Sequence, residues 1–139
     1  MDKAGRVEYW LDIAEYDLET ANSMLSTGRY LYVMIMCHQA LEKLCKALFV
    51  DIYDKEPPRT HNLNYILARM HSERPEIGLQ AERVTPFLTD LSAYYLEGRY
   101  PSYKEKLSTL VDCDKARVTY FKTKEVFAWL KSLLESIKQ

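Results

Sequence analysis

The segment 28–51 constrains the fold most strongly, because apolar side chains recur in it at alternating spacings of four and three residues. This alternation places the side chains along one face of an α-helix, whose turn is about 3.6 residues. The residues with this spacing are Tyr30, Met34, Cys37, Leu41, Leu44 and Leu48. A stripe of this length predicts a long helix with a core-facing seam, placed centrally in its bundle.

A polar strip follows the same helical period on the neighbouring face. It consists of Gln39, Glu42, Lys43 and Lys46, and His38 precedes Glu42 by one turn. In one interpretation, Glu42 and Lys46 form an ion pair between successive turns, and Gln39 and Lys43 are solvated neighbours. In the other, the two lysines bind a phosphate group while Gln39 and Glu42 orient an arginine or bind a base or ribose. The residues alone leave both interpretations open.

The same four-three alternation predicts long helices over 3–26 and over 110–137. Gly28 follows Thr27 as a C-terminal cap of the first helix. The short connection to the segment 28–51 makes the two helices antiparallel, and Trp10 is expected in the interior of this hairpin. Thr109 and Asp112 are available to cap the last helix.

Prolines and glycines separate the remaining elements. After Pro57 and Pro58, Thr60 is expected to cap a short helix. Thr85 followed by Pro86 indicates the start of a fourth helix over 86–97, although a start near residue 79 is also compatible with the pattern.

Length and composition agree with these elements. The chain has 139 residues, of which 47% are apolar, with only four glycines and five prolines. We therefore predict a single domain, 1–139, with an all-α fold: an up-and-down four-helix bundle with an additional short helix.

Composition also narrows the classes of function. The net charge of -1 provides no general attraction to nucleic acid, so any such contact must be local. Three cysteines without a Cys-x-x-Cys spacing are expected to be reduced thiols, and no export signal or membrane-length apolar run is apparent, which together predict a cytoplasmic protein without membrane contact. We see no glycine-rich phosphate loop and no zinc-ligand spacing, and expect no cofactor and no metal.

Three motifs in this order resemble the HEPN domain family. They are His38-Gln-Ala-Leu-Glu-Lys-Leu-Cys-Lys-Ala-Leu in the central helix, Thr60-His-Asn-Leu before the short helix, and Arg99-Tyr-Pro after the fourth. The resemblance covers nearly the whole chain and implies a helical bundle that often dimerises. It also implies a small nucleotidyltransferase as partner, since small prokaryotic HEPN proteins are frequently paired with one, and many such pairs act as toxin and antitoxin.

Active HEPN ribonucleases are metal-independent and combine an arginine with a histidine four to six residues further on. Here Arg99 is followed by no histidine, and the last histidine of the chain is His71. The general acid or base that is missing usually contributes about 10²–10⁴ in rate. His61, at the start of a helix, is expected to make a structural hydrogen bond.

We therefore expect a nucleotide- or RNA-phosphate-binding homodimer that acts as partner of the nucleotidyltransferase, and not an enzyme. One alternative is a ribonuclease toxin in which Arg99 and loop tyrosines act without the usual histidine, and another is a structural module without a nucleotide site. By the resemblance, Tyr103 is the candidate for adenylylation by the partner. The candidate nucleotide- or phosphate-binding residues are Gln39, Glu42, Lys43, Lys46, Arg99 and Tyr100.

Overall fold

The computed structural model describes residues 1–99 and 109–136, with side chains over 1–96 and 109–136. The described chain consists of helices joined by turns and short loops. The helices are α1 (Lys3–Ser26), α2 (Tyr30–Tyr53), α3 (Leu63–Met70), α4 (Pro75–Arg99) and α5 (Cys113–Ser132). The predicted all-α bundle is confirmed, and α3 is the additional short helix.

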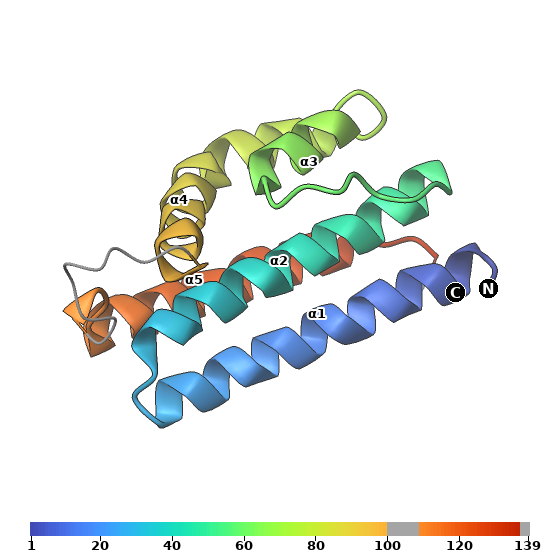
Figure 1. The fold of residues 1–139 in the computed structure, drawn as a ribbon. Coiled ribbons are helices and arrows are strands. Elements are labelled where there is room, and N and C mark those ends of the chain that lie inside the picture. The colour runs from blue at the N-terminus through green and yellow to red at the C-terminus, as the bar shows by residue number, and fades with distance from the viewer. Residues whose placement is uncertain (100–108, 137–139) are drawn as a thin grey trace.

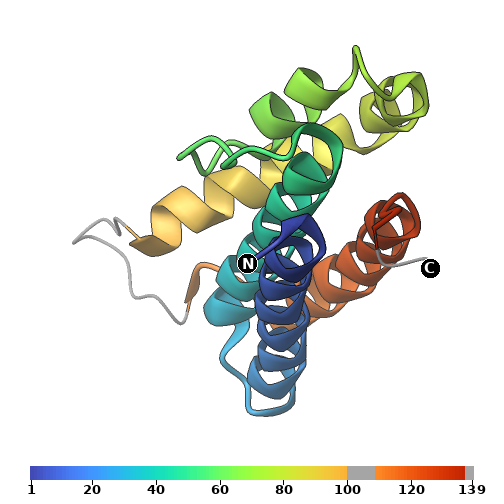
Figure 2. The same ribbon diagram turned by 90° about the vertical axis from the view of Figure 1, so that its right-hand side faces the viewer.

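Helix α2 is the central element and contacts each of the other four helices. It runs antiparallel to α1 (Figure 1), and the view turned by 90° shows α5 and the α3–α4 pair on different sides of this hairpin (Figure 2). This position explains why most residues of α2 are buried. A helix in such a place needs apolar side chains on more than one face.

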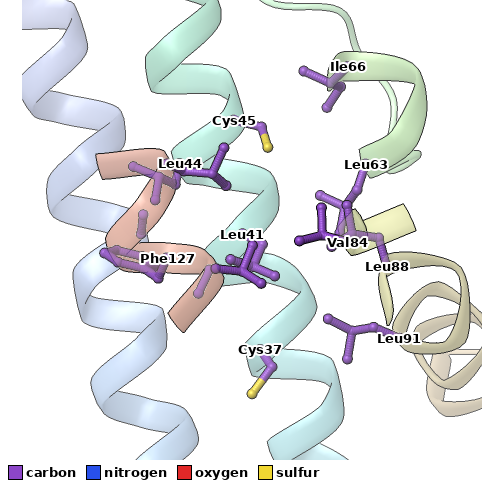
Figure 3. Close-up of a cluster of buried hydrophobic side chains, with 14 of the residues drawn as sticks. Cys37, Leu41, Leu44, Cys45, Leu63, Ile66, Val84, Leu88, Leu91 and Phe127 are labelled. Carbon is purple, nitrogen blue, oxygen red and sulfur yellow. The ribbon is translucent and has the colours of Figure 1, made fainter. Parts of the chain in front are cut away.

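The predicted seam of α2 is confirmed. Met34, Cys37, Leu41, Leu44 and Leu48 are fully buried and Tyr30 is half-buried. Figure 3 shows the middle of α2 between side chains from α5 on one side and from α3 and α4 on the other. The labelled neighbours from these helices are Phe127, Leu63, Ile66, Val84, Leu88 and Leu91. Their packing fixes the position of α4 against α2.

The first helix has the predicted bounds. Its N-cap is Asp2, whose carboxylate accepts a hydrogen bond from the backbone N–H of Gly5 at 2.8 Å. Gly28 follows the C-cap Thr27 with a φ of 81°, a left-handed conformation that glycine adopts without steric cost.

The cap predicted for the short helix is wrong by two residues. Asn62, and not Thr60, is the N-cap of α3, because its side chain accepts from the N–H of Tyr65 at 3.1 Å. The Thr60 hydroxyl accepts from the N–H of Asn62 at 3.1 Å and so shapes the turn before the helix. Asparagine and threonine both cap helices well, so the two positions compete.

Helix α4 is longer than 86–97, and the prediction of a start at Pro86 is wrong. The helix begins at Pro75, Pro86 lies inside it, and the Thr85 hydroxyl donates to the carbonyl of Ala81 at 2.7 Å. Figure 1 shows a bend in α4, which is typical of a helix with an internal proline. Burial of Ile77 and Val84 keeps the first half of the helix in place in spite of this proline.

Helix α5 is shorter at both ends than the predicted 110–137. It begins after Asp112, whose carboxylate caps the N–H of Lys115 at 2.8 Å, and it ends at Ser132. Leu134 lies beyond the helix but is fully buried, so its apolar spacing reflects packing without helical backbone. Asp51 of α2 holds this last segment by accepting the backbone N–H groups of Glu135 and Ser136 at 2.8 and 3.1 Å.

Over the described ranges, none of the helices has both the length and the apolar character needed to cross a lipid bilayer.

Candidate functional site

The carboxylate of Glu42 is the centre of the polar strip on α2. Its side chain is only 1% exposed, yet three partners surround it. The ammonium groups of Lys46 and Lys43 lie 3.1 and 3.5 Å from Oε2, and His61 Nδ1 lies 2.8 Å from Oε1. The predicted ion pair between Glu42 and Lys46 is therefore present, but it is buried and not solvated.

These partners also determine the charge of Glu42. Burial by itself raises the pKa of this carboxyl, but the hydrogen bond to His61 and the two ammonium groups outweigh it, so the pKa lies below its usual value. Glu42 is thus ionised at neutral pH. The structural hydrogen bond expected of His61 is confirmed, and it ties the segment before α3 to α2.

The two lysines of the strip extend toward α1. Their ammonium groups lie 5.6 Å (Lys43) and 5.7 Å (Lys46) from the ring centroid of Trp10, which is half-buried against the core as expected. A cation this close to an indole ring is attracted by the negative face of its π-system. Both lysines therefore lie between a carboxylate and an aromatic ring, and Gln39 is half-buried one turn away.

Three candidate residues cannot be placed beside this cluster. Arg99 is the last residue of α4, but its side chain lies outside the description, and Tyr100 and Tyr103 lie outside the described residues. Whether this loop meets the polar strip stays a prediction.

A pocket of about 470 Å³ opens beside Glu42, on the side of α2 that faces α3 and α4. Its volume falls within the range of about 300–1,000 Å³ that is typical of small-molecule sites. The described lining residues are His38, Thr60, His61, Asn62, Asn64, Thr89, Ser92, Tyr95 and Leu96. His61 belongs both to the pocket and to the Glu42 cluster, and so connects the two.

Sequence reasoning missed most of this pocket. Tyr95 is only 4% exposed and belongs to the core, but its ring also forms a wall of the pocket. A signal was available on α4, where Thr89, Ser92 and Leu96 recur at spacings of three and four and mark a second, partly polar face. The spacing does not reveal which residues of other elements this face of α4 contacts.

His38 lines the pocket together with Tyr95. It is fully buried, and its ring stacks on that of Tyr95 with 4.1 Å between centroids and 15° between planes. Within the described part of the chain, neither ring nitrogen has a hydrogen-bond partner, and the Glu42 carboxylate is 3.9 Å from Nδ1. Burial lowers the pKa of His38 to about 4, although the Glu42 carboxylate and the backbone of His61 act in the opposite direction. The imidazole is therefore neutral at pH 7.

The cysteines offer no reactive group in this region. Cys37 and Cys45 are buried among apolar side chains (Figure 3), and burial raises the pKa of each thiol to about 12. Among the described residues, no group of three His, Cys, Asp or Glu side chains is arranged to hold a metal ion.

The Glu42 cluster predicts a large effect of one isosteric substitution. Glu42→Gln leaves the buried ammonium of Lys46 without its counter-charge, and we expect the free energy of unfolding to fall by about 3 kcal/mol. The matched control is Glu125→Gln, which removes an exposed pair with Lys122 at 3.5 Å and should cost less than about 1 kcal/mol. Urea denaturation at neutral pH measures both, and equal losses would contradict a buried ionic centre.

His38 predicts a loss of stability in mild acid. The unfolded chain protonates this imidazole near pH 6.5 but the folded chain only near pH 4, so the unfolded state binds more protons between these values. The free energy of unfolding should therefore decrease by about 2 kcal/mol from pH 7 to pH 5 through this group alone. His38→Phe should remove this contribution, and urea denaturation of both proteins across this range measures it. An unchanged pH dependence in the variant would contradict a neutral, buried His38.

Comparison with known proteins agrees with this fold. The family model described as HEPN domain matches residues 7–133. A solved structure with a similar fold is TT1696 from Thermus thermophilus, which is 21% identical, with a TM-score of 0.77 over 93% of this chain and 98% of that chain. No curated protein matches the sequence. Because the family model spans most of the chain, this protein belongs to the HEPN domain family.

Proposed function

We propose that this protein is a nucleotide- or RNA-binding homodimer that acts as the partner of a small nucleotidyltransferase in a two-component system of the toxin–antitoxin type. The observation that supports the binding part is the pocket of about 470 Å³, which is lined by hydroxyl and amide side chains as well as apolar ones and shares His61 with the lysine cluster around Glu42. A pocket with hydroxyl and amide groups next to ammonium groups suits a ligand with a ring and a phosphate. The pairing with a nucleotidyltransferase is supported by the family resemblance alone.

Within the cluster, Lys43 is the better phosphate contact. Its side chain is 24% exposed, compared with 9% for Lys46, whose ammonium is closer to Glu42. We assign Lys46, Glu42 and Gln39 the role of holding Lys43 in position, and Arg99 and Tyr100 that of a second phosphate contact and a stacking surface.

The homodimer is proposed to form near the end of α4, so that two copies of the Arg99 loop face one groove. A two-fold contact pairs the same patch with itself. Leu96, a large apolar side chain that is 57% exposed one turn before the end of α4, supports this location. A monomer at micromolar concentration would count against it.

One observation favours ribonuclease activity as a second candidate function. His61 Nδ1 contacts the Glu42 carboxylate at 2.8 Å, and a neutral imidazole that donates from Nδ1 keeps Nε2 as a proton acceptor. This arrangement provides a general base that the segment after Arg99 lacks. The third possibility, a structural module, requires only that Glu42 and His61 hold the loop before α3 in place.

Binding and cleavage of a labelled RNA without metal separate these functions. We expect binding to weaken in Lys43→Ala and Arg99→Ala, with the slope of log affinity against log salt reduced by about 1 for each lost phosphate contact. Lys122→Ala, on the exposed face of α5, is the control and should bind RNA as the wild type does.

Cleavage of the RNA by the wild type that disappears in His61→Ala and Arg99→Ala would establish ribonuclease activity instead. No response to RNA, ATP or GTP at millimolar concentration would remove the binding function.

The pairing is tested with a small nucleotidyltransferase from the same organism. We expect the two to co-elute in size-exclusion chromatography, and incubation with ATP to add one adenylyl group that mass spectrometry locates on Tyr103. Tyr103→Phe should lose the added mass and retain the complex. If the two proteins co-elute but no adenylyl group is transferred, the pairing is supported and Tyr103 as the modification site is contradicted. If they elute separately, the pairing itself is contradicted.

A further inference from the structure

We propose that the pocket between α2, α3 and α4 binds an uncharged heteroaromatic ring that carries hydrogen-bond donors and acceptors on its edge, with His38 as its buried partner. This inference rests on the proposed function for the choice of pocket, and it deepens that function by naming what the pocket itself binds, which requires neither the lysines, nor Arg99, nor the nucleotidyltransferase. A free heterocycle and the base of a nucleotide have this chemistry in common.

The charge of the lining determines the class of ligand. The described lining residues include no lysine, arginine, aspartate or glutamate. The nearest carboxylate, that of Glu42, is occupied by His61 and the two lysines. An ionised ligand group would therefore lose its hydration in this pocket without gaining a counter-charge among the described residues. Hydroxyl and amide groups, in contrast, satisfy neutral donors and acceptors.

The aromatic groups determine the shape of the ligand. The stacked rings of His38 and Tyr95 form one wall, and the ring of His61 lies 5.5 Å from that of Tyr95 at 46°. Flat surfaces of this kind favour a planar ligand over an aliphatic one, because rings stack with offset faces. Asn62 and Asn64 come from the loop and first turn of α3, whereas Thr89 and Ser92 come from α4. Polar side chains from two segments thus line the pocket, and the two segments are joined by the hydrogen bond that Asn64 Nδ2 donates to Thr89 Oγ1 at 3.1 Å.

His38 gives the site its specificity. The neutral imidazole has one donor and one acceptor. Within the described part of the chain, neither nitrogen has a hydrogen-bond partner of normal geometry, although the backbone of His61 is close enough to act on the ring. Buried polar atoms without partners destabilise a protein, and a ligand that pairs with either nitrogen relieves this cost. Because Tyr95 covers the ring, we expect the Tyr95 side chain to shift when the ligand enters.

The test uses ligands without phosphate. Adenine, nicotinamide and adenosine are titrated into the ¹⁵N-labelled full chain, with AMP as the phosphate-containing arm and cyclohexanecarboxamide as the non-aromatic control. We expect at least one neutral ring to shift the amide signals of Asn62, Asn64, Thr89 and Ser92 and the imidazole nitrogens of His38. Binding of free adenine would show that the pocket recognises the ring itself. If adenosine binds and adenine does not, the ligand is a nucleoside.

His38→Phe distinguishes a ligand-binding role from a structural one. It retains the stacked ring and removes both nitrogens, so we expect the variant to melt no lower than the wild type at pH 7 and to bind the ring about tenfold more weakly, as for one lost hydrogen bond. His71→Phe makes the same change on a histidine that packs against Gly78 outside the pocket, and should bind normally. Ser92→Leu fills the half-buried rim without touching His38 and should abolish binding.

Two outcomes overturn the proposal. One is the absence of any shift with the neutral rings at millimolar concentration. The other is that AMP alone binds, and that its binding is weakened in Lys43→Ala but unchanged in His38→Phe. This result would support phosphate binding and contradict the heterocycle site.

Discussion

A buried carboxylate on the central helix is the constraint on which the arrangement around the pocket depends. Removing an ionised group from water costs several kcal/mol unless partners compensate for it. Glu42 obtains these partners from its own helix, through Lys43 and Lys46, and from the loop before α3, through His61. The loop that forms one rim of the pocket is consequently fixed by the same charge that positions the lysines. Any ligand that competes for His61 or for the lysines acts on this charge as well.

The central position of α2 provides the framework for this charge. Its apolar seam packs against α1, α4 and α5, so the polar strip beside it is confined to the narrow spaces that remain. One space lies against Trp10 and takes the ammonium groups, and the other lies against Tyr95 and takes His38. The two kinds of environment, cationic around the lysines and neutral around His38, therefore occur on one helix about two turns apart. In the proposed function, this separation assigns the phosphate and the ring of a ligand to different side chains.

Much of the fold could be predicted because its dominant signal is local. The apolar alternation of α1 and α2 identified both helices and their buried faces, and Gly28 marked the turn between them. The ends of α3, α4 and α5 were predicted less well, because several residues with good capping chemistry compete there. Pro86 locally favours a helix start, but the helix continues through it because Ile77 and Val84, earlier in the same helix, are buried.

The candidate site was harder to predict from the sequence, since the bond from Glu42 to His61 and the stacking of His38 on Tyr95 join residues 19 and 57 positions apart. Such contacts depend on how α3 and α4 cross α2, which no spacing within one helix reveals.

The position of Trp10 gives the molecule an internal optical reporter. Indole emission responds to nearby charge, and this ring lies within 5.7 Å of both ammonium groups of the cluster. The chain has only one other tryptophan, Trp129 on α5, so replacing that residue with phenylalanine leaves a single indole, which can be excited selectively over the tyrosines. Its spectrum then follows the electrostatic state of the lysines in solution, without a label attached to the surface.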